Sequence, residues 1–146
     1  MSVPMPGDDG GVGVPTGEVP LDAAQCRSLM ASECTGRIVF TRGALPECRP
    51  VAFTWDGDWI VFAVDDPVVA RAIAGSLVAA FEVDGVDPTL DVPWTVLALG
   101  ETSRILSAVD ETRLRPLLHG AWAAGPSAEM LALRPERLSG VCVAHP

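Results

Sequence analysis

The sequence predicts a mainly β fold, an antiparallel barrel of six strands with a few short helices. Two observations support this prediction. Runs of β-branched and aromatic residues recur along the chain between turn residues, which is the pattern of strands. The helical patterns are few and short and do not alternate with the strands, which argues against a parallel sheet built from βαβ units. A barrel is the antiparallel arrangement that removes exposed sheet edges.

Length and composition limit the function classes. The 146 residues fit one domain, and 49% of them are hydrophobic. The net charge is −9 and the ten basic residues are scattered arginines, which disfavours nucleic acids and anionic membranes as partners. No segment reaches the roughly 20 apolar residues of a membrane helix, and the first residues lack the pattern of a signal peptide. A cytoplasmic protein is therefore expected.

Residues 1–20 are predicted to be a disordered tail, and residues 21–146 to form the folded domain. The tail holds five glycines and four prolines with few large apolar side chains, so it cannot offset the entropy of ordering. Asp22 is expected to cap a helix that runs to about Glu33.

Three strands are expected next, at residues 36–41, 50–55 and 59–64. The second and third flank the step Asp56-Gly57. Because Asp-Gly favours the primed turns that match the twist of paired strands, these two strands should form a tight hairpin.

The second half is predicted to begin with a helix at residues 66–74. Pro67 suits a first helical turn, an acidic residue is favourable at the positive end, and Gly75 stops the helix. The remaining elements are expected to be strands at 78–83, 94–100 and 137–143 and a helix at 110–119 that Pro116 breaks.

The sequence contains no complete catalytic motif. It lacks a G-x-S-x-G elbow, a P-loop and a dinucleotide fingerprint, and it has no tyrosine. The two histidines, His119 and His145, do not suggest a triad. The four cysteines lack metal or redox spacing, so no metal site is expected and buried free thiols are the favoured state.

Two sets of side chains have both a structural and a functional interpretation. Glu82 and Asp84 alternate on one strand and so share a face; they would form an acid/base pair or, as is commoner, end a strand in solvent. The tryptophans at 55, 59 and 94 would line a pocket for a flat ring or pack in the core. Any chemistry would be that of a bound cofactor.

The order of several segments points to a family. They are, in chain order, residues 29–32 with 36–38, 50–53 before the Asp56-Gly57 turn, 60–62, 78–84, 94–96 before Gly100, and 134–140. Together these segments resemble the FMN-binding split-barrel family, whose best-known members are pyridoxamine 5'-phosphate oxidases. The resemblance covers about residues 21–143. It implies a six-stranded split β-barrel of the Greek-key type, which works as a homodimer and binds FMN in grooves between the subunits.

The resemblance also implies the residues that would contact the cofactor. Arg71 would bind the phosphate from the helix after Asp66, or be a solvated helix-face arginine, and Arg49 would add a second positive charge. Phe53 and Trp94 would pack on the ring or belong to the core. The full implied set is Arg49, Val51, Ala52, Phe53, Ala63, Val64, Arg71 and Trp94.

The chain departs from the family pattern at some of these positions. Relatives tend to carry polar residues where this chain has Ala52, Ala63 and Val64, and their basic helix residue aligns with Val69 or, with a small shift, Arg71. Two alternatives follow: a barrel that binds another ligand or only its partner subunit, and a deazaflavin-dependent reductase, which the acidic composition disfavours. Oxidation of pyridoxamine 5'-phosphate itself is not expected, because no further basic cluster is available for that substrate.

Overall fold

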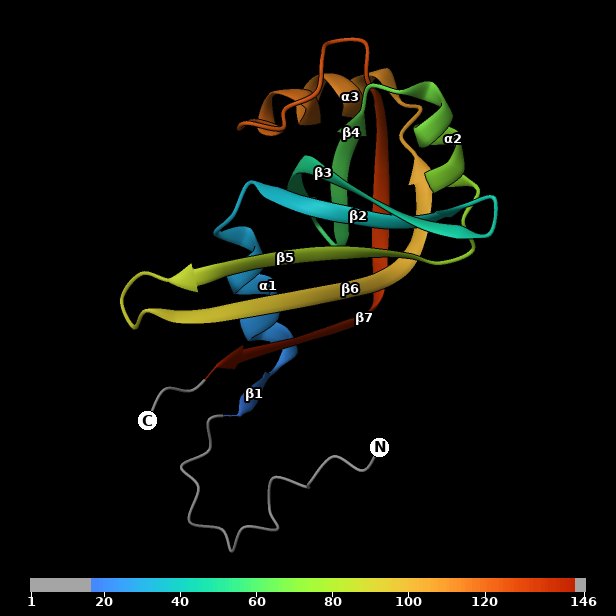
Figure 1. Ribbon diagram of the computed structural model, residues 1–146. Helices are drawn as coiled ribbons and strands as arrows, with labels where there is room; N and C mark the ends of the chain where they lie inside the picture. Colours follow the sequence, from blue (N-terminus) through green and yellow to red (C-terminus); the bar gives the residue numbers. More distant parts are fainter. Residues whose placement is uncertain (1–16, 144–146) are drawn as a thin grey trace, which may run out of the picture.

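The chain forms a six-stranded antiparallel barrel with three helices in the computed structural model, which describes residues 17–143 (Figure 1). The mainly β antiparallel fold predicted from the sequence is confirmed. The strands are β1 (Glu18–Leu21), β2 (Thr35–Arg42), β3 (Leu45–Asp56), β4 (Trp59–Val64), β5 (Ala79–Asp87), β6 (Val92–Arg104) and β7 (Glu129–Val143). The helices are α1 (Ala23–Ala31), α2 (Pro67–Ala74) and α3 (Ala108–Leu114), and α3 continues into a 3₁₀ turn (Arg115–Leu117).

Six strands close into a ring because β7 has a partner on each side. Around the ring the order is β7, β4, β3, β2, β5 and β6, and β6 pairs again with β7. All of these pairs are antiparallel. The ring therefore consists of β2 to β7, the number of strands that the sequence predicts for the barrel.

A seventh strand, β1, lies outside this ring. It pairs with the end of β7, with Glu18 opposite Val143 and Leu21 opposite Gly140. The described fold thus begins before Leu21, the predicted start of the domain, because a long-range partner stabilises a segment that has no strand pattern of its own. Residues 1–16 of the predicted tail lie outside the described residues.

Strand β3 begins five residues earlier than the predicted strand at 50–55. Gly43 and Ala44 have φ of +58° and +65°, the pattern of a type I′ turn, and join β2 directly to β3. This half of β3 contains Pro46 and Pro50. They are tolerated because this half of β3 pairs along one side with β2 while pairing with β4 starts only at Phe53, and proline is accepted on strands with a free edge.

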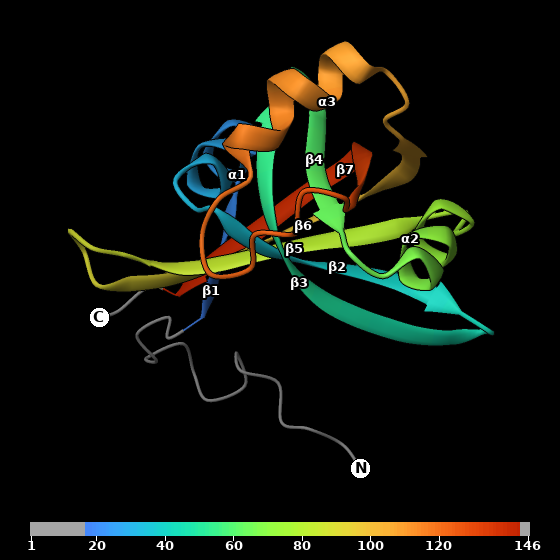
Figure 2. The same ribbon diagram turned by 90° about the horizontal axis from the view of Figure 1, so that it is seen from above.

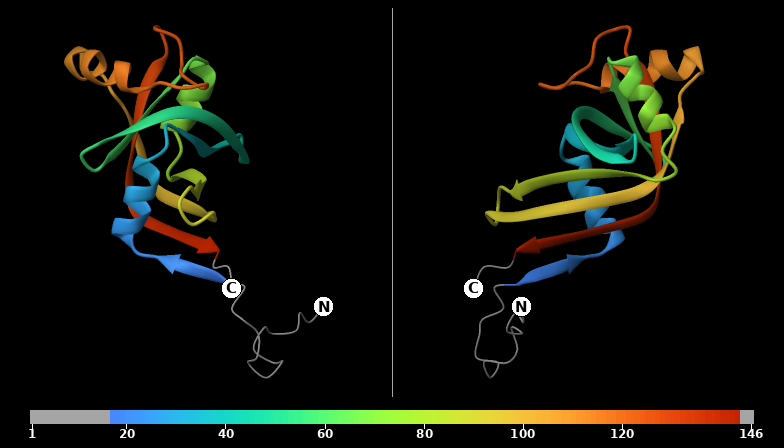
Figure 3. Two further views of the ribbon diagram at one scale, coloured as in Figure 1. Left: turned by 90° about the vertical axis from the view of Figure 1, so that its left-hand side faces the viewer. Right: turned by 45° about the vertical axis from the view of Figure 1, so that its right-hand side comes forward.

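Strand β7 begins eight residues before the predicted strand at 137–143. Within it, Pro135 lies at a bulge where the β6–β7 register shifts between Leu99 and Gly100. A Cβ on Gly100 would lie 1.9 Å from the carbonyl oxygen of Arg134, so only glycine fits there. Both views of Figure 3 show β7 bending along its length.

The predicted cap at Asp22, the predicted start of the second helix and the predicted hairpin are confirmed. Asp22 and Asp66 accept hydrogen bonds from backbone N–H groups at the starts of α1 and α2. Gly57 has a φ of +58° in a two-residue turn between β3 and β4, which fits a type II′ turn. Helix α3 begins two residues before the predicted start at 110, because Ser107 supplies its cap, and Pro116 falls in the 3₁₀ turn.

Two apolar clusters hold the fold together. The larger fills the barrel, where the ring of Phe81 lies 5.1 Å from that of Phe53 and 5.7 Å from that of Phe62. The smaller lies on the outer face of β3, β4 and β7, beneath α3 and the segment 118–128, which we call the strap (Figure 2). Its buried members are Ala52, Val61, Ala63, Leu114, Leu118, Ala128, Met130 and Ala132.

Within residues 17–143, no helix is long and apolar enough to cross a membrane, and no three potential metal ligands cluster. All four cysteines are free thiols, but only Cys26 is fully buried, and burial raises the pKa of its thiol. The expectation of buried thiols is wrong for Cys48, which is exposed because it lies on the half of β3 with a free edge.

Candidate functional site

Four of the implied site residues meet in one pocket at the start of α2. Arg49 and Val51 come from β3, and Ala63 and Val64 from the end of β4. The pocket, which we call the α2 pocket, has a volume of about 220 Å³. Its other lining residues are Pro50, Asp65, Asp66, Val69 and the strap residues Ala121, Trp122, Ala123 and Ala124.

The strap forms one wall of this pocket and is fixed by backbone hydrogen bonds. Ala52 N–H donates to the carbonyl oxygen of Trp122 at 3.3 Å, and Gly125 N–H donates to Asp65 Oδ1 at 2.9 Å. The guanidinium of Arg115 donates to the Ala128 carbonyl at 3.0 Å. The strap is therefore tied both to β3 and to the junction between β4 and α2.

The strap covers two of the implied flavin-contact positions, one on β3 and one on β4. Ala52 is 2% exposed and Ala63 is 5% exposed, and both belong to the outer apolar cluster. Small side chains at these positions allow the strap to lie close to β3 and β4. At these two positions, part of the implied flavin face is in contact with the chain itself.

Three other implied site residues lie away from the α2 pocket. Phe53 and Trp94 are 2% and 5% exposed and belong to the barrel core, which matches the structural alternative for each. Arg71 is exposed on the last turn of α2. Since Val69 lines the pocket and each residue turns a helix by about 100°, a side chain two positions later points away from the pocket.

The charged groups of the α2 pocket differ in how firmly they are held. Asp66 accepts from Val68 N–H at 2.9 Å, and Asp65 is held by the strap. The side chain of Arg49 is half-exposed, and its nearest carboxylate, that of Glu47, is 3.7 Å away. Arg49 is therefore the charged group with most freedom to turn toward a ligand.

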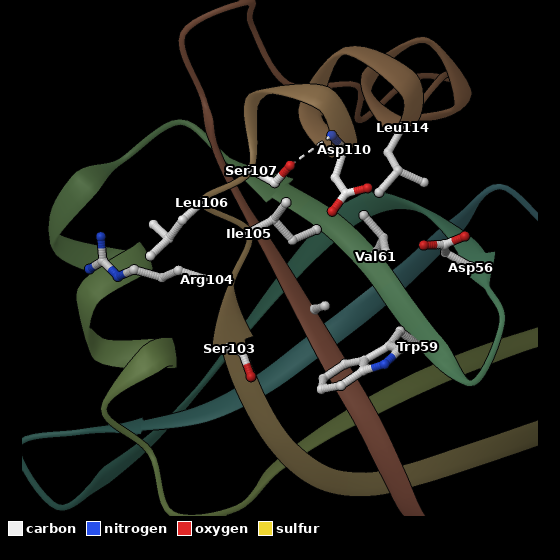
Figure 4. A pocket seen from close by; sticks show the side chains of 11 residues that line it. Asp56, Trp59, Val61, Ser103, Arg104, Ile105, Leu106, Ser107, Asp110 and Leu114 are labelled. Carbon is white, nitrogen blue, oxygen red and sulfur yellow. Dashed lines mark hydrogen bonds between the residues drawn. The ribbon is translucent and has the colours of Figure 1, made fainter.

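A second pocket lies beneath α3, with a volume of about 280 Å³ (Figure 4). Arg113 donates two 3.0 Å hydrogen bonds to Asp56 and one of 3.1 Å to Asp110, and hydrogen bonding from this guanidinium lowers the pKa of Asp56. These ion pairs join α3 to the β3–β4 hairpin, which is a structural role. The lining residues are Asp56, Trp59, Val61, Ser103, Arg104, Ile105, Leu106, Ser107, Asp110, Leu114 and Ala132.

The pair Glu82 and Asp84 is not a free acid/base pair. Arg37 lies between them, with its Nη1 2.9 Å from Glu82 Oε1 and 2.7 Å from Asp84 Oδ1, and Glu82 also accepts from the hydroxyl of Thr95. The hydrogen bond to Asp84 has the largest effect on the pKa of Arg37, and together with the bond to Glu82 it raises that pKa. The arrangement is an exposed ion-pair network on the outer face of β2, β5 and β6.

The sequence analysis missed Trp122 as a pocket residue. It follows a helix end in a stretch rich in glycine and alanine, and nothing local indicates that this stretch crosses β3 and β4. The signal that could have found it is compositional, since Trp122 is the one large aromatic residue between Leu118 and Glu129.

Comparisons with known proteins agree with this architecture. A family model described as pyridoxamine 5'-phosphate oxidase matches residues 22–141. An uncharacterized protein from Mycobacterium tuberculosis is 34% identical over 129 residues, which is 84% of each chain.

Solved structures share the fold at low sequence identity. An FAD-binding protein from Mycobacterium smegmatis has a TM-score of 0.68 at 20% identity, over 86% of this chain and 98% of that one. An FAD-binding protein from Mesorhizobium loti has a TM-score of 0.73 at 12% identity, over 87% and 99%. Since the family model spans most of the sequence and the barrel matches these structures, the chain belongs to the pyridoxamine 5'-phosphate oxidase family of split-barrel proteins.

Proposed function

We propose that this chain binds a flavin, FMN, in the α2 pocket and serves as a flavin-dependent oxidoreductase of a small molecule. The observation that carries the proposal is the meeting of Arg49 with Ala63, Val51 and Val64 around one pocket at the start of α2, where Val51 and Val64 also pack in the barrel core. Membership of the family and the FAD-binding proteins of the same fold support a flavin as the ligand.

The residues of the pocket fit the two parts of such a ligand. The apolar wall and the strap suit a flat ring, because ligand pockets are mostly apolar with a few placed polar groups. Arg49 suits the phosphate, since a guanidinium pairs with phosphate oxygens through two parallel hydrogen bonds. At about 220 Å³ the pocket is smaller than usual ligand sites, so part of the flavin extends beyond it.

A bound flavin would supply hydride or single-electron transfer. The chain itself would bind and orient the part of the ring that enters the α2 pocket, beside the strap, and would keep water from its covered face. None of the described residues that line the α2 pocket is a histidine, cysteine or serine. Its two carboxylates, Asp65 and Asp66, accept hydrogen bonds from the backbone N–H groups of Gly125 and Val68, so the role assigned to the pocket is binding.

The proposal includes a second copy of the chain as partner. On the outer face of the sheet, Ala80 lies opposite both Val39 of β2 and Leu99 of β6, and Leu97 lies opposite Glu82. This apolar row beside the Arg37 ion pairs is a face that an identical chain can cover. Light scattering should give the mass of two chains, and a single-chain mass at micromolar concentration would refute this part.

The test of the cofactor is a titration with FMN, FAD and riboflavin, followed by absorbance and flavin fluorescence. Arg49→Ala should weaken FMN binding about tenfold or more and leave riboflavin binding nearly unchanged, because a charge-assisted hydrogen bond contributes about 1.5–3 kcal/mol. Arg42→Ala is the matched control, since Arg42 also contacts Glu47, at 2.7 Å, but does not line the α2 pocket.

The cover of Ala52 and Ala63 by the strap favours a second candidate, a barrel of this family that binds another ligand or only its partner subunit. The same titration separates the two candidates. Failure to take up any of the three flavins would refute the first and support the second. A further arm with a deazaflavin cofactor covers the remaining alternative.

A further inference from the structure

One large aromatic side chain, that of Trp122, lies at the rim of the α2 pocket and has no role in the proposed binding of the flavin. Trp122 lines this pocket and is 56% exposed. An exposed tryptophan leaves a wide apolar surface in water, which is unfavourable unless something covers it. Its backbone is not loose, because its carbonyl accepts the hydrogen bond from Ala52 N–H.

The residues around Trp122 keep the strap close to the sheet. Its neighbours in the pocket wall, Ala121, Ala123 and Ala124, are all small. At Gly125 an added Cβ would lie 3.1 Å from Asp65 Oδ1, so the backbone passes tightly over the start of α2. The strap thus carries one large side chain, that of Trp122, whose backbone is held by a hydrogen bond and which lies at the opening of the α2 pocket.

We infer that Trp122 stacks on the ring of the ligand in the α2 pocket and forms the wall opposite β4. This inference rests on the proposed function, and it names a binding residue that comes from the same chain as Arg49. A planar, electron-poor ring is the chemistry that an indole face recognises, and offset stacking is its preferred arrangement.

The test compares Trp122→Ala, Trp122→Phe and Trp122→Leu by titration with riboflavin and FMN. Stacking of a ring on an aromatic side chain predicts about tenfold weaker binding for alanine and a change of less than about threefold for phenylalanine. Leucine keeps apolar bulk without a π face, so its loss should be closer to that of alanine. Because Trp122 is largely exposed, the variants should keep the wild-type melting curve, which circular dichroism checks.

A second readout does not depend on affinity. Ring stacking should quench the fluorescence of Trp122 on addition of riboflavin, and this part of the signal should vanish in Trp122→Phe. Trp59→Phe is the matched control, since Trp59 is also partly exposed but lines the pocket beneath α3.

The outcomes separate this inference from the proposed function. If the wild type binds flavin and Trp122→Ala binds it equally well with the same quenching, the inference is wrong while the proposed function stands. If Trp122→Ala instead lowers the mass by light scattering with flavin affinity unchanged, Trp122 covers a second copy and the inference is also wrong. If the wild type binds no flavin, both are wrong.

Discussion

Replacing Gly100 by alanine is expected to destabilise the fold by about 3 kcal/mol, the upper part of the usual range for overpacking. The added Cβ would lie 1.9 Å from the carbonyl oxygen of Arg134 and 2.7 Å from its carbonyl carbon, whereas ordinary contact begins near 3.4 Å. Both atoms belong to the backbone of β7 and cannot swing aside. The two strands would therefore have to separate where they close the barrel.

Urea unfolding followed by tryptophan fluorescence measures this loss, and thermal unfolding by circular dichroism should show a melting temperature lower by about 10 °C. Gly17→Ala is the matched control, because nothing lies within 4 Å of a Cβ there, and it should change stability by less than about 0.5 kcal/mol. If Gly100→Ala stays within about 1 kcal/mol of the wild type, the β6–β7 bulge is not the tight closure described above.

Two further predictions concern the exposed ion pairs and the proposed dimer face. Arg113 lowers the pKa of Asp56, so the stability from this pair is present above the ordinary carboxyl range and is lost as pH falls through the folded-state pKa. Urea melts should show a small deficit for Asp56→Asn at pH 7 that shrinks as the pH falls below the ordinary carboxyl pKa; a deficit that does not shrink with falling pH would contradict the assignment. Leu97→Glu should give single chains by light scattering, whereas Leu106→Glu, an 85% exposed site outside the proposed face, should not; an unchanged mass for Leu97→Glu would place the dimer elsewhere.

Much of the barrel could be predicted from local pattern. The Asp56-Gly57 step, the cap at Asp22 and the β-branched run of β4 each depend on neighbouring residues, and the structure confirms them. The predicted strands at 50–55 and 137–143 are shorter than the observed β3 and β7. Pro50 and Pro135 indicate breaks in a single strand, but a free edge and a bulge respectively accommodate them, and both features arise from pairing with distant strands.

Some residues of the candidate site could likewise be predicted, and others depend on the tertiary structure. The resemblance implied Arg49, Val51, Ala63 and Val64, and these four meet in the α2 pocket because they lie on paired or adjoining strand ends. The resemblance implied Arg71 because it lies near the aligned basic position of the helix after Asp66. In the structure its side chain is on the solvent-exposed face of α2. Trp122 could not be placed, because the path of the strap is set by hydrogen bonds to Ala52 and Asp65 that have no local signature.

The sequence by itself determined the types of the elements from α1 onward and the tight hairpin, because turn chemistry, capping and residue alternation act within a few residues of one another. The order of its segments indicated the family by resemblance. Only the tertiary structure decided which faces of those strands are covered. The sequence places Ala52 and Ala63 on two paired strands, but it does not show whether their side chains are covered. Their contact with a strap more than 50 residues further along the chain follows from closure of the barrel, which is a property of the whole chain.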